Sequence, residues 1–388
     1  MHYDVVVIGA GIQGAGVAQA AAAAGYSVLV LEQKAIAAGT SSKSSKLIHG
    51  GLRYLETAQF GLVRESLQER ALLLKLAPEL VKLQPLHIPV YNTSTRSPLM
   101  IRAGLSLYSV LAGLRNNAQF RSLPESEWDS LTGLRQEGLR EVFRYHEAQT
   151  DDAALTAAVL RSAVSLGTEV LIPARFTAAR VEGQRCSIDY EIDGQSHTVT
   201  ASVLMNCSGP WALDVLARIT PSQPLPAVEL VQGSHLLLPP LLQQYFYLEA
   251  PRDQRAIFVL PWKQQLLIGT TETIHHGPPD EARCLDSEKA YLLETLQHYF
   301  PSLDLSGVPV AGFAGLRVLP RSDKNAFNRS REVLLDVDNA ACPRVLSLMG
   351  GKLTTYRPTA RTALERVRAA LPERKPRGDT ASLPLTPE

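Results

Sequence analysis

The sequence predicts an α/β fold in which a domain built on a parallel sheet is interleaved with a second, mainly antiparallel β domain. Two observations carry this prediction. The chain opens with an apolar strand, a helix of small residues and a second apolar strand, and similar strands return near residues 202–207 and 345–349. Between them, above all from Val228 to Val337, the pattern is rich in strands. A chain of 388 residues is long enough for two such domains.

The opening βαβ unit carries a phosphate-binding fingerprint. The strand at 3–9 (YDVVVIG) runs into Gly9, Gly11 and Gly14 in the spacing G-x-G-x-x-G, and a helix follows at once. Glycines let the backbone approach a pyrophosphate, and the helix N-terminus supplies N–H donors and a positive dipole end. The next strand ends in Glu32, near the spacing at which an acidic residue binds a ribose. The unit therefore predicts a bound dinucleotide, either NAD or FAD.

The rest of the chain favours FAD. The fingerprint occurs once, at the very start of the sequence. Two later strands end in Ser208-Gly209 and in Gly350-Gly351-Lys352. This layout suits a long cofactor that is held at several points along one domain.

Composition excludes several classes of function. Lys plus Arg is 39 and Asp plus Glu is 38, so no basic field points to nucleic acid as a partner. The four cysteines lie far apart without a C-x-x-C pair, which predicts reduced thiols, a cytoplasmic protein and no metal site. The first strand begins at Tyr3 with no charged leader before it. No apolar run approaches the roughly 20 residues that span a bilayer.

Further elements divide the chain between the two domains. We expect helices at 59–75, from the Asp151-Asp152 cap to Gly167, near 287–299 and from Lys352 to about Leu371, with a meander at 174–201. The parallel-sheet domain is predicted at 1–80, 151–220 and 343–372, and the second domain at 81–150 and 221–342. The proline-rich, charged segment 373–388 is predicted to be a disordered tail.

Seven blocks in a fixed order resemble one known family. They are TSSKSSKLIHGGLRYL, LMNCSGPW, LVQGSH, IFVLPW, LIGTTE, AGLR and GGKLTTYR. Together they closely resemble the FAD-dependent, quinone-type glycerol-3-phosphate dehydrogenases, and the resemblance covers residues 3 to about 366. It implies a glutathione-reductase-like FAD-binding Rossmann domain with an interleaved substrate domain. The family usually continues into a helical C-terminal domain beyond this core.

Two blocks depart from the family pattern. The family's G-x-R-P-L is Gly315-Leu316-Arg317-Val318-Leu319 here, without the proline, and its G-T-T-D ends in Glu272. The resemblance implies oxidation of sn-glycerol 3-phosphate to dihydroxyacetone phosphate, with electrons passed to quinone or another acceptor.

The resemblance also gives roles to the polar stretch Thr40–Leu55. Residues 40–45 would hold the flavin's ribityl–diphosphate chain, residues 46–51 would run past the flavin ring, and Arg53 and Tyr54 would face the substrate. The full set expected to bind FAD is Gly9, Gly11, Gly14, Glu32, Thr40, Ser41, Ser42, Ser45, Lys46, His49, Gly50, Ser208, Gly209, Gly351, Lys352, Leu353 and Thr354.

The residues expected at the substrate are Arg53, Tyr54, His235, Arg317 and Arg331. Arg317 and Arg331 match family positions that hold the phosphate, which guanidinium groups bind through paired hydrogen bonds. His235 is the candidate base for the substrate hydroxyl, with His49 as the alternative. Lys352 would stabilise negative charge on the reduced flavin. Arg53, His235, Arg317 and Lys352 form the predicted catalytic set.

Other interpretations stay open at this stage. The same fold could serve an FAD-dependent oxidase or dehydrogenase of a hydroxy or amino acid, or a flavin-binding scaffold or redox sensor without turnover. The apolar segment Leu99–Leu114 is too short to span a bilayer. It predicts either a helix lying in the membrane interface, near a quinone, or a core helix of the second domain. The oligomeric state is not predicted.

Overall fold

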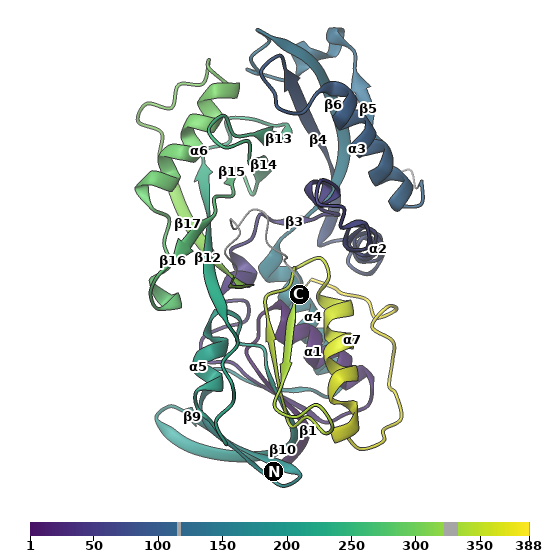
Figure 1. The fold of residues 1–388 in the computed structure, drawn as a ribbon, viewed down its shortest axis with the longest axis vertical. Helices are drawn as coiled ribbons and strands as arrows, with labels where there is room; N and C mark the ends of the chain where they lie inside the picture. Colours follow the sequence, from purple (N-terminus) through teal and green to yellow (C-terminus); the bar gives the residue numbers. More distant parts are fainter. Residues whose placement is uncertain (115–117, 322–332, 388) are drawn as a thin grey trace.

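The computed structural model describes residues 1–114, 118–321 and 333–387. Two sheets stacked along the long axis of the molecule organise these residues (Figure 1). The lower sheet has the order β11-β8-β9-β10-β1-β2-β7, with β19 beside β10 and β18 beside β19. The upper sheet has the order β16-β12-β15-β14-β13-β4-β6-β3, with β17 beside β12 and β5 beside β6.

The lower sheet is the predicted parallel domain. Its strands are β1 (His2–Ile8), β2 (Val28–Leu31), β7 (Glu169–Leu171), β8 (Arg175–Glu182), β9 (Arg185–Ile192), β10 (Gln195–Asn206), β11 (Ile219–Thr220), β18 (Leu334–Val337) and β19 (Val345–Met349). β1 pairs in parallel with β2 and β10, and β10 pairs in parallel with β19. Three segments far apart in the sequence therefore share one sheet, as the sequence predicts.

Three helices cover one face of this sheet: α1 (Ile12–Ala23), α4 (Asp152–Ser165) and α7 (Tyr356–Val367). A short helix, α5 (Ala212–Leu216), packs on the opposite face. A Cβ atom added at Gly14 would lie 1.9 Å from the Gly9 carbonyl oxygen, so only glycine lets α1 start this close to β1. The Asp151 side chain caps α4 by accepting a hydrogen bond from the Ala154 N–H (3.0 Å), as predicted.

The upper sheet is mainly antiparallel. Its strands are β3 (Leu47–Ile48), β4 (Val81–Tyr91), β5 (Arg121–Leu123), β6 (Leu139–Thr150), β12 (Val228–Leu238), β13 (Tyr245–Glu249), β14 (Ala256–Trp262), β15 (Gln265–Gly269), β16 (Thr273–His275) and β17 (Ala311–Pro320). α6 (Asp286–Tyr299) packs at one end, and α2 (Phe60–Leu76) and α3 (Pro98–Leu111) pack at the other.

Two pairings lie across the predicted boundaries. β3, inside the range 1–80, pairs with β6 of the upper sheet, and β18, inside 221–342, pairs with β19 of the lower sheet. The chain therefore passes between the sheets more often than a division into five segments describes. The boundaries themselves stay a prediction.

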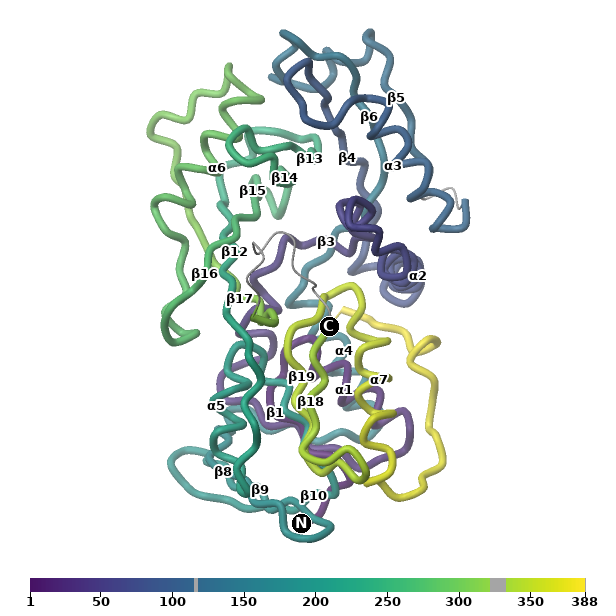
Figure 2. The backbone as a smooth tube through the Cα atoms, viewed as in Figure 1, coloured from purple at the N-terminus to yellow at the C-terminus, as the bar shows by residue number. Residues whose placement is uncertain are grey.

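The predicted disordered tail was wrong. The Arg374 guanidinium binds the Asp4 carboxylate, the Arg377 N–H donates to the Ala23 carbonyl, and the Leu385 N–H donates to the Leu76 carbonyl. Leu385 is buried in the core of the lower domain. Figure 2 shows this last segment running outside α7 and returning to the middle of the molecule. Composition suggested disorder because the overall amino-acid content of a segment does not reveal one buried leucine or a few backbone hydrogen bonds.

Within the described residues no helix is both long and apolar enough to cross a membrane. α3 includes most of the apolar segment predicted at 99–114, and its two faces differ. Leu105 and Tyr108 are buried, whereas Leu99, Met100 and Val110 are exposed.

Candidate active site

A cavity of about 610 Å³ lies where the two sheets meet. This size is typical of cofactor and substrate sites. Of the residues predicted from the sequence, its wall contains Gly9, Gly11, Glu32, Thr40, Ser41, Ser45, His49, Arg53, Tyr54, Ser208, Gly209, His235, Arg317, Gly351, Lys352, Leu353 and Thr354. Gly14, Ser42, Lys46 and Gly50 are not on the wall. Arg331 lies outside the described residues.

One end of the cavity is formed by the opening βαβ unit. The Glu32 carboxylate, at the end of β2, accepts hydrogen bonds from the backbone N–H groups of Ala10 (2.9 Å) and Lys34 (2.8 Å). These bonds fix a buried carboxylate beside the glycine turn, where the sequence predicts a ribose ligand. The first N–H of α1, that of Ile12, donates to the Ser41 hydroxyl (2.9 Å), so the polar stretch at 40–46 is tied to the helix N-terminus.

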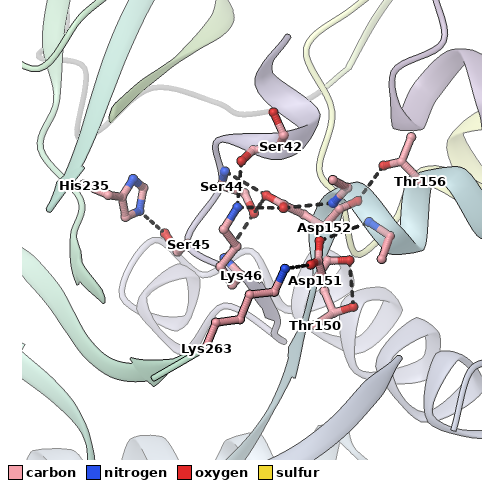
Figure 3. A network of polar contacts seen from close by, with 12 residues as sticks. Ser42, Ser44, Ser45, Lys46, Thr150, Asp151, Asp152, Thr156, His235 and Lys263 are labelled. Carbon is pink, nitrogen blue, oxygen red and sulfur yellow. Dashed lines mark hydrogen bonds and ion pairs between the residues drawn. The ribbon is translucent and has the colours of Figure 1, made fainter. Parts of the chain in front are cut away.

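We call residues 40–46 the strap, and Figure 3 shows how it is anchored. The Lys46 ammonium lies 2.7 Å from the Asp152 carboxylate and donates to the Ser42 carbonyl, also at 2.7 Å. Ser44 donates to the same carboxylate from its N–H (3.0 Å) and its hydroxyl (2.7 Å). Because Lys46 and Asp152 are both buried, each neutralises a charge that would otherwise be costly to bury.

Lys46 therefore holds the strap in place rather than lining the cavity. At the other end of the strap, the Thr40 hydroxyl donates to the carbonyl of Leu316 on β17 (2.7 Å). The strap thus connects both sheets along one wall of the cavity.

His235, on β12, contacts the strap directly. Its Nε2 lies 2.8 Å from the Ser45 hydroxyl, and its ring stacks on Phe313 with 5.1 Å between centroids. Burial lowers the pKa of His235 from 6.5 to about 3, and the charges of Arg317 and Lys46 act in the same direction. The imidazole is therefore neutral at physiological pH. Its buried Nδ1 has no hydrogen-bond partner among the described residues.

His49 also lines the cavity, so both candidate bases, His235 and His49, are on its wall. Its backbone N–H donates to the Thr354 hydroxyl (3.3 Å), and its ring lies 6.2 Å from that of Phe258. The hydrogen bond to Thr354 joins the segment after the strap to the Gly-Gly-Lys turn that follows β19.

Arg53, Arg317 and Lys352 are cationic side chains that line the same cavity. The Lys352 ammonium lies 4.0 Å from the centre of the Tyr54 ring, and the Arg53 guanidinium lies 5.4 Å from it. Arg317 projects from β17 of the upper sheet and also lines the cavity. Its Nη2 lies 3.5 Å from the Thr270 hydroxyl, and its Nη1 lies 3.8 Å from the Glu272 carboxylate. The wall therefore attracts an anion.

In the sequence, Glu272 was noted only as a departure from the family pattern, and neither carboxylate behind these residues was given a role. Glu272 is fully buried and also pairs with Arg255. Glu288, at the start of α6, accepts hydrogen bonds from the hydroxyls of Ser234 and Thr271 (2.7 Å each) and so fixes the residue before His235. Burial alone would raise the pKa of Glu288, but these bonds and others outweigh it and lower the pKa. Isolated glutamates give no pattern that a sequence reader could use.

The family model for FAD dependent oxidoreductases matches residues 4–357 of this chain. The chain belongs to this family. Among its curated relatives, the glycerol-3-phosphate dehydrogenase of Pseudomonas aeruginosa is 38% identical over 93% of this chain and 71% of its own length. The aerobic glycerol-3-phosphate dehydrogenase of Escherichia coli is 38% identical over 94% of this chain and 73% of its own.

The name of another curated relative specifies a different polyol phosphate. The D-erythritol 1-phosphate dehydrogenase of Brucella abortus is 33% identical over 95% of this chain and 74% of its own length. Among solved structures, the glycerol-3-phosphate dehydrogenase of Bacillus halodurans complexed with FAD superimposes with a TM-score of 0.77. It is 26% identical and the match covers 99% of this chain and 68% of that one.

FAD is the cofactor of the family, and the cavity fits it. The glycine turn leaves no room for a side chain at Gly14, and Glu32 stands at the end of β2. Gln13 and His235 belong to the residues that line the cavity, and their buried atoms Gln13 Oε1 and His235 Nδ1 have no hydrogen-bond partner among the described residues. Such atoms are costly to bury unless a ligand or water binds them.

Proposed function

We propose that this FAD-dependent oxidoreductase oxidises sn-glycerol 3-phosphate to dihydroxyacetone phosphate. The observation that supports the proposal is the shared cavity wall of Arg53, Arg317 and Lys352 with a neutral His235. Guanidinium groups match a phosphate dianion in charge and geometry, whereas a single carboxylate needs only one such partner. The wall therefore favours a phosphorylated alcohol over a hydroxy or amino acid.

Each residue has a defined task in this proposal. Gly9, Gly11, Glu32 and the strap would hold FAD, which, when bound, supplies the acceptor for the hydride on substrate C2. Arg317 and Arg53 bind the phosphate and so orient C2. His235 takes the proton of the C2 hydroxyl as the carbonyl forms. Lys352 would supply a positive charge that stabilises the reduced flavin.

The low pKa of His235 is compatible with this work. Burial and the Arg317 charge both lower the pKa of His235 and so favour the neutral ring. A bound phosphate dianion offsets the Arg317 charge and raises the proton affinity of the imidazole. The base thus becomes stronger once its substrate is in place.

The proposal is tested by anaerobic reduction of the bound flavin. The candidates are glycerol 3-phosphate, D-erythritol 1-phosphate, glycerol, lactate and glycine. Arg317→Ala should lower kcat/KM for glycerol 3-phosphate by about two to three orders of magnitude, because truncating one partner of a buried charge pair costs roughly 2–5 kcal/mol. Arg317→Lys should recover part of the loss, since an ammonium keeps the charge but not the fork.

Arg252→Ala is the matched control. Arg252 is an exposed arginine that, like Arg317, pairs with a glutamate, in this case Glu294 on α6. This variant should leave kcat/KM unchanged. Near-normal turnover of glycerol 3-phosphate by Arg317→Ala would overturn the substrate assignment. Reduction of the flavin by lactate or glycine alone would move the hydroxy-acid or amino-acid interpretation to the front.

We further propose that electrons pass to a quinone and that α3 docks on the inner surface of the cell membrane. The exposed apolar side chains Leu99, Met100 and Val110 lie on one helix whose other face is buried. An amphipathic helix of this kind lies flat in the membrane interface. Leu105 belongs to the buried face, so a substitution there would disturb the core and would not test membrane docking.

Leu99→Glu with Val110→Glu should release the protein from anionic liposomes and slow reduction of a lipid-soluble quinone. Reduction of a water-soluble dye should not change. Lys82→Glu, an exposed change on β4, is the control for added negative charge. Equal sedimentation of all three proteins with liposomes would contradict the docking proposal.

A further inference from the structure

A chain of buried polar groups lies behind the glycine pair that follows the strap. The N–H of Gly50 donates to the hydroxyl oxygen of Tyr108 (3.0 Å). The Tyr108 hydroxyl donates to Glu147, and the Arg70 guanidinium donates to the other oxygen of that carboxylate (2.6 Å). Tyr108, Glu147 and Arg70 are each only 1% exposed. The chain joins α3, β6 and α2 to one backbone amide.

The direction of each hydrogen bond in this chain is fixed. Burial, followed by the Glu147 charge, raises the pKa of Tyr108 well above 10, so the phenol keeps its proton. Tyr108 has a single O–H, which it donates to the carboxylate. Its oxygen is then left to accept from the Gly50 N–H. Burial raises the pKa of Glu147 while the adjacent Arg70 charge opposes that change. The Glu147 carboxylate is thus held by Tyr108 on one oxygen and by Arg70 on the other.

The amide held by this chain lies just before the segment that carries Arg53 and Tyr54. Gly50 and Gly51 lead directly into a short 3-10 helix, Leu52–Leu55, that carries Arg53 and Tyr54. A Cβ atom added at Gly50 would lie 2.4 Å from the Tyr108 hydroxyl, so the backbone rests against that oxygen. The Tyr54 N–H donates to the Gly51 carbonyl (2.9 Å). A shift of Gly50 therefore moves Arg53 and Tyr54 together.

A wholly structural role does not account for this arrangement. A buried ion pair is weak as a source of stability, because removing two charges from water offsets most of their attraction. What such a chain gives is a defined position, since each member has only one geometry that satisfies its neighbours. Glu147 itself also lines the cavity.

We propose that Tyr108, held by Glu147 and Arg70, is a positioning residue that sets the Gly50–Tyr54 turn and, through it, the place of Arg53 in the substrate site. This inference rests on the proposed function, in which Arg53 and Tyr54 face the substrate. Tyr108 is not among the residues that line the cavity, and it acts through the backbone of Gly50.

The test compares FAD-loaded Tyr108→Phe with Tyr91→Phe. Tyr91 is a matched control, because its buried hydroxyl donates to a carbonyl, that of Arg135 (2.6 Å), far from the cavity. Hydrogen–deuterium exchange of the peptide spanning residues 47–58 is the first readout. We expect exchange at this peptide to speed up about tenfold or more in Tyr108→Phe, and to stay unchanged in Tyr91→Phe.

The second readout is steady-state kinetics with glycerol 3-phosphate. In Tyr108→Phe the KM should rise about tenfold with a smaller change in kcat, because Arg53 binds the substrate and does not take part in proton transfer. If Tyr108→Phe fails to fold, Glu147→Gln carries the same test. Tyr108 and Arg70 bind different oxygens of Glu147, and glutamine replaces one of them with an NH₂ group that cannot accept, so one bond is lost and the same exchange and KM changes are expected.

The outcomes separate this inference from the proposed function. Wild-type protein that does not turn over glycerol 3-phosphate would overturn the proposed function, while the exchange readout would still report on the turn. Tyr108→Phe and Glu147→Gln that match Tyr91→Phe in both exchange and KM would overturn the positioning role.

Discussion

Replacing His235 with asparagine should make the protein less sensitive to acid. In the folded protein burial lowers the pKa of His235 to about 3, whereas in the unfolded chain it returns to about 6.5. Between about pH 6.5 and pH 3 the unfolded state therefore binds a proton at His235 that the folded state does not bind. Stability is fully present above pH 6.5 and is lost as the pH falls towards 3.

The size of the effect follows from the two pKa values. Each pH unit between them removes about 1.4 kcal/mol from the free energy of unfolding. From pH 7 to pH 5 the loss due to His235 is about 2 kcal/mol. His87, His146 and His298 also have lowered pKa values through burial, but they contribute equally to the wild type and the variant. The difference between the two proteins therefore isolates His235.

Urea denaturation at pH 7 and pH 5, with FAD at one saturating concentration, measures this difference. His235→Asn should be less stable at pH 7, because the Ser45 hydroxyl loses its partner, yet it should lose about 2 kcal/mol less on acidification. His276→Asn, at an exposed histidine, is the control and should follow the wild type. An acid loss in His235→Asn equal to that of the wild type would refute the burial argument.

Three other predictions concern groups around the same cavity. Lys352→Met should lower the flavin midpoint potential in a spectroelectrochemical titration, because a positive charge near the reduced ring is gone; an unchanged potential would place Lys352 away from the flavin. Asp152→Asn should weaken FAD binding about tenfold or more in a fluorescence titration, since the buried Lys46 that anchors the strap loses its counter-ion; an unaltered affinity would show that the strap does not need this pair. Leu385→Ala should lower the free energy of unfolding by about 2–3 kcal/mol with the flavin potential unchanged, because a buried leucine is truncated; wild-type stability would mean that the tail is not docked in solution.

Local patterns predicted the nucleotide end of the fold well. The strand, glycine turn, helix and acidic residue at 3–32 all act over short distances in sequence, and periodicity and turn chemistry record them directly. The Asp151 cap was predicted for the same reason. The β1, β10 and β19 strands were recognisable because strands buried on both faces are continuously apolar.

The anchors of the site were not predictable in this way. Lys46 meets Asp152 across 106 positions of sequence, and Gly50 meets Tyr108 across 58. The sequence marked Asp152 only as part of a helix cap, and it marked Tyr108 only as part of an apolar segment. Each partner is chosen by tertiary packing, which a single sequence does not record.

The order of strands in the lower sheet also sets when the cofactor can be captured during synthesis. β1 must wait for β10 to emerge, and β10 must wait for β19, whose following turn supplies Gly351 to Thr354 of the cavity wall. Pairings over such distances form late, because the intervening chain has to be closed into loops first. The ribosome therefore has to release the segments as far as Thr354 before the flavin has a complete wall to bind. Until β10 has emerged, the apolar strand β1 has an unpaired edge on its β10 side, and unpaired apolar edges favour aggregation.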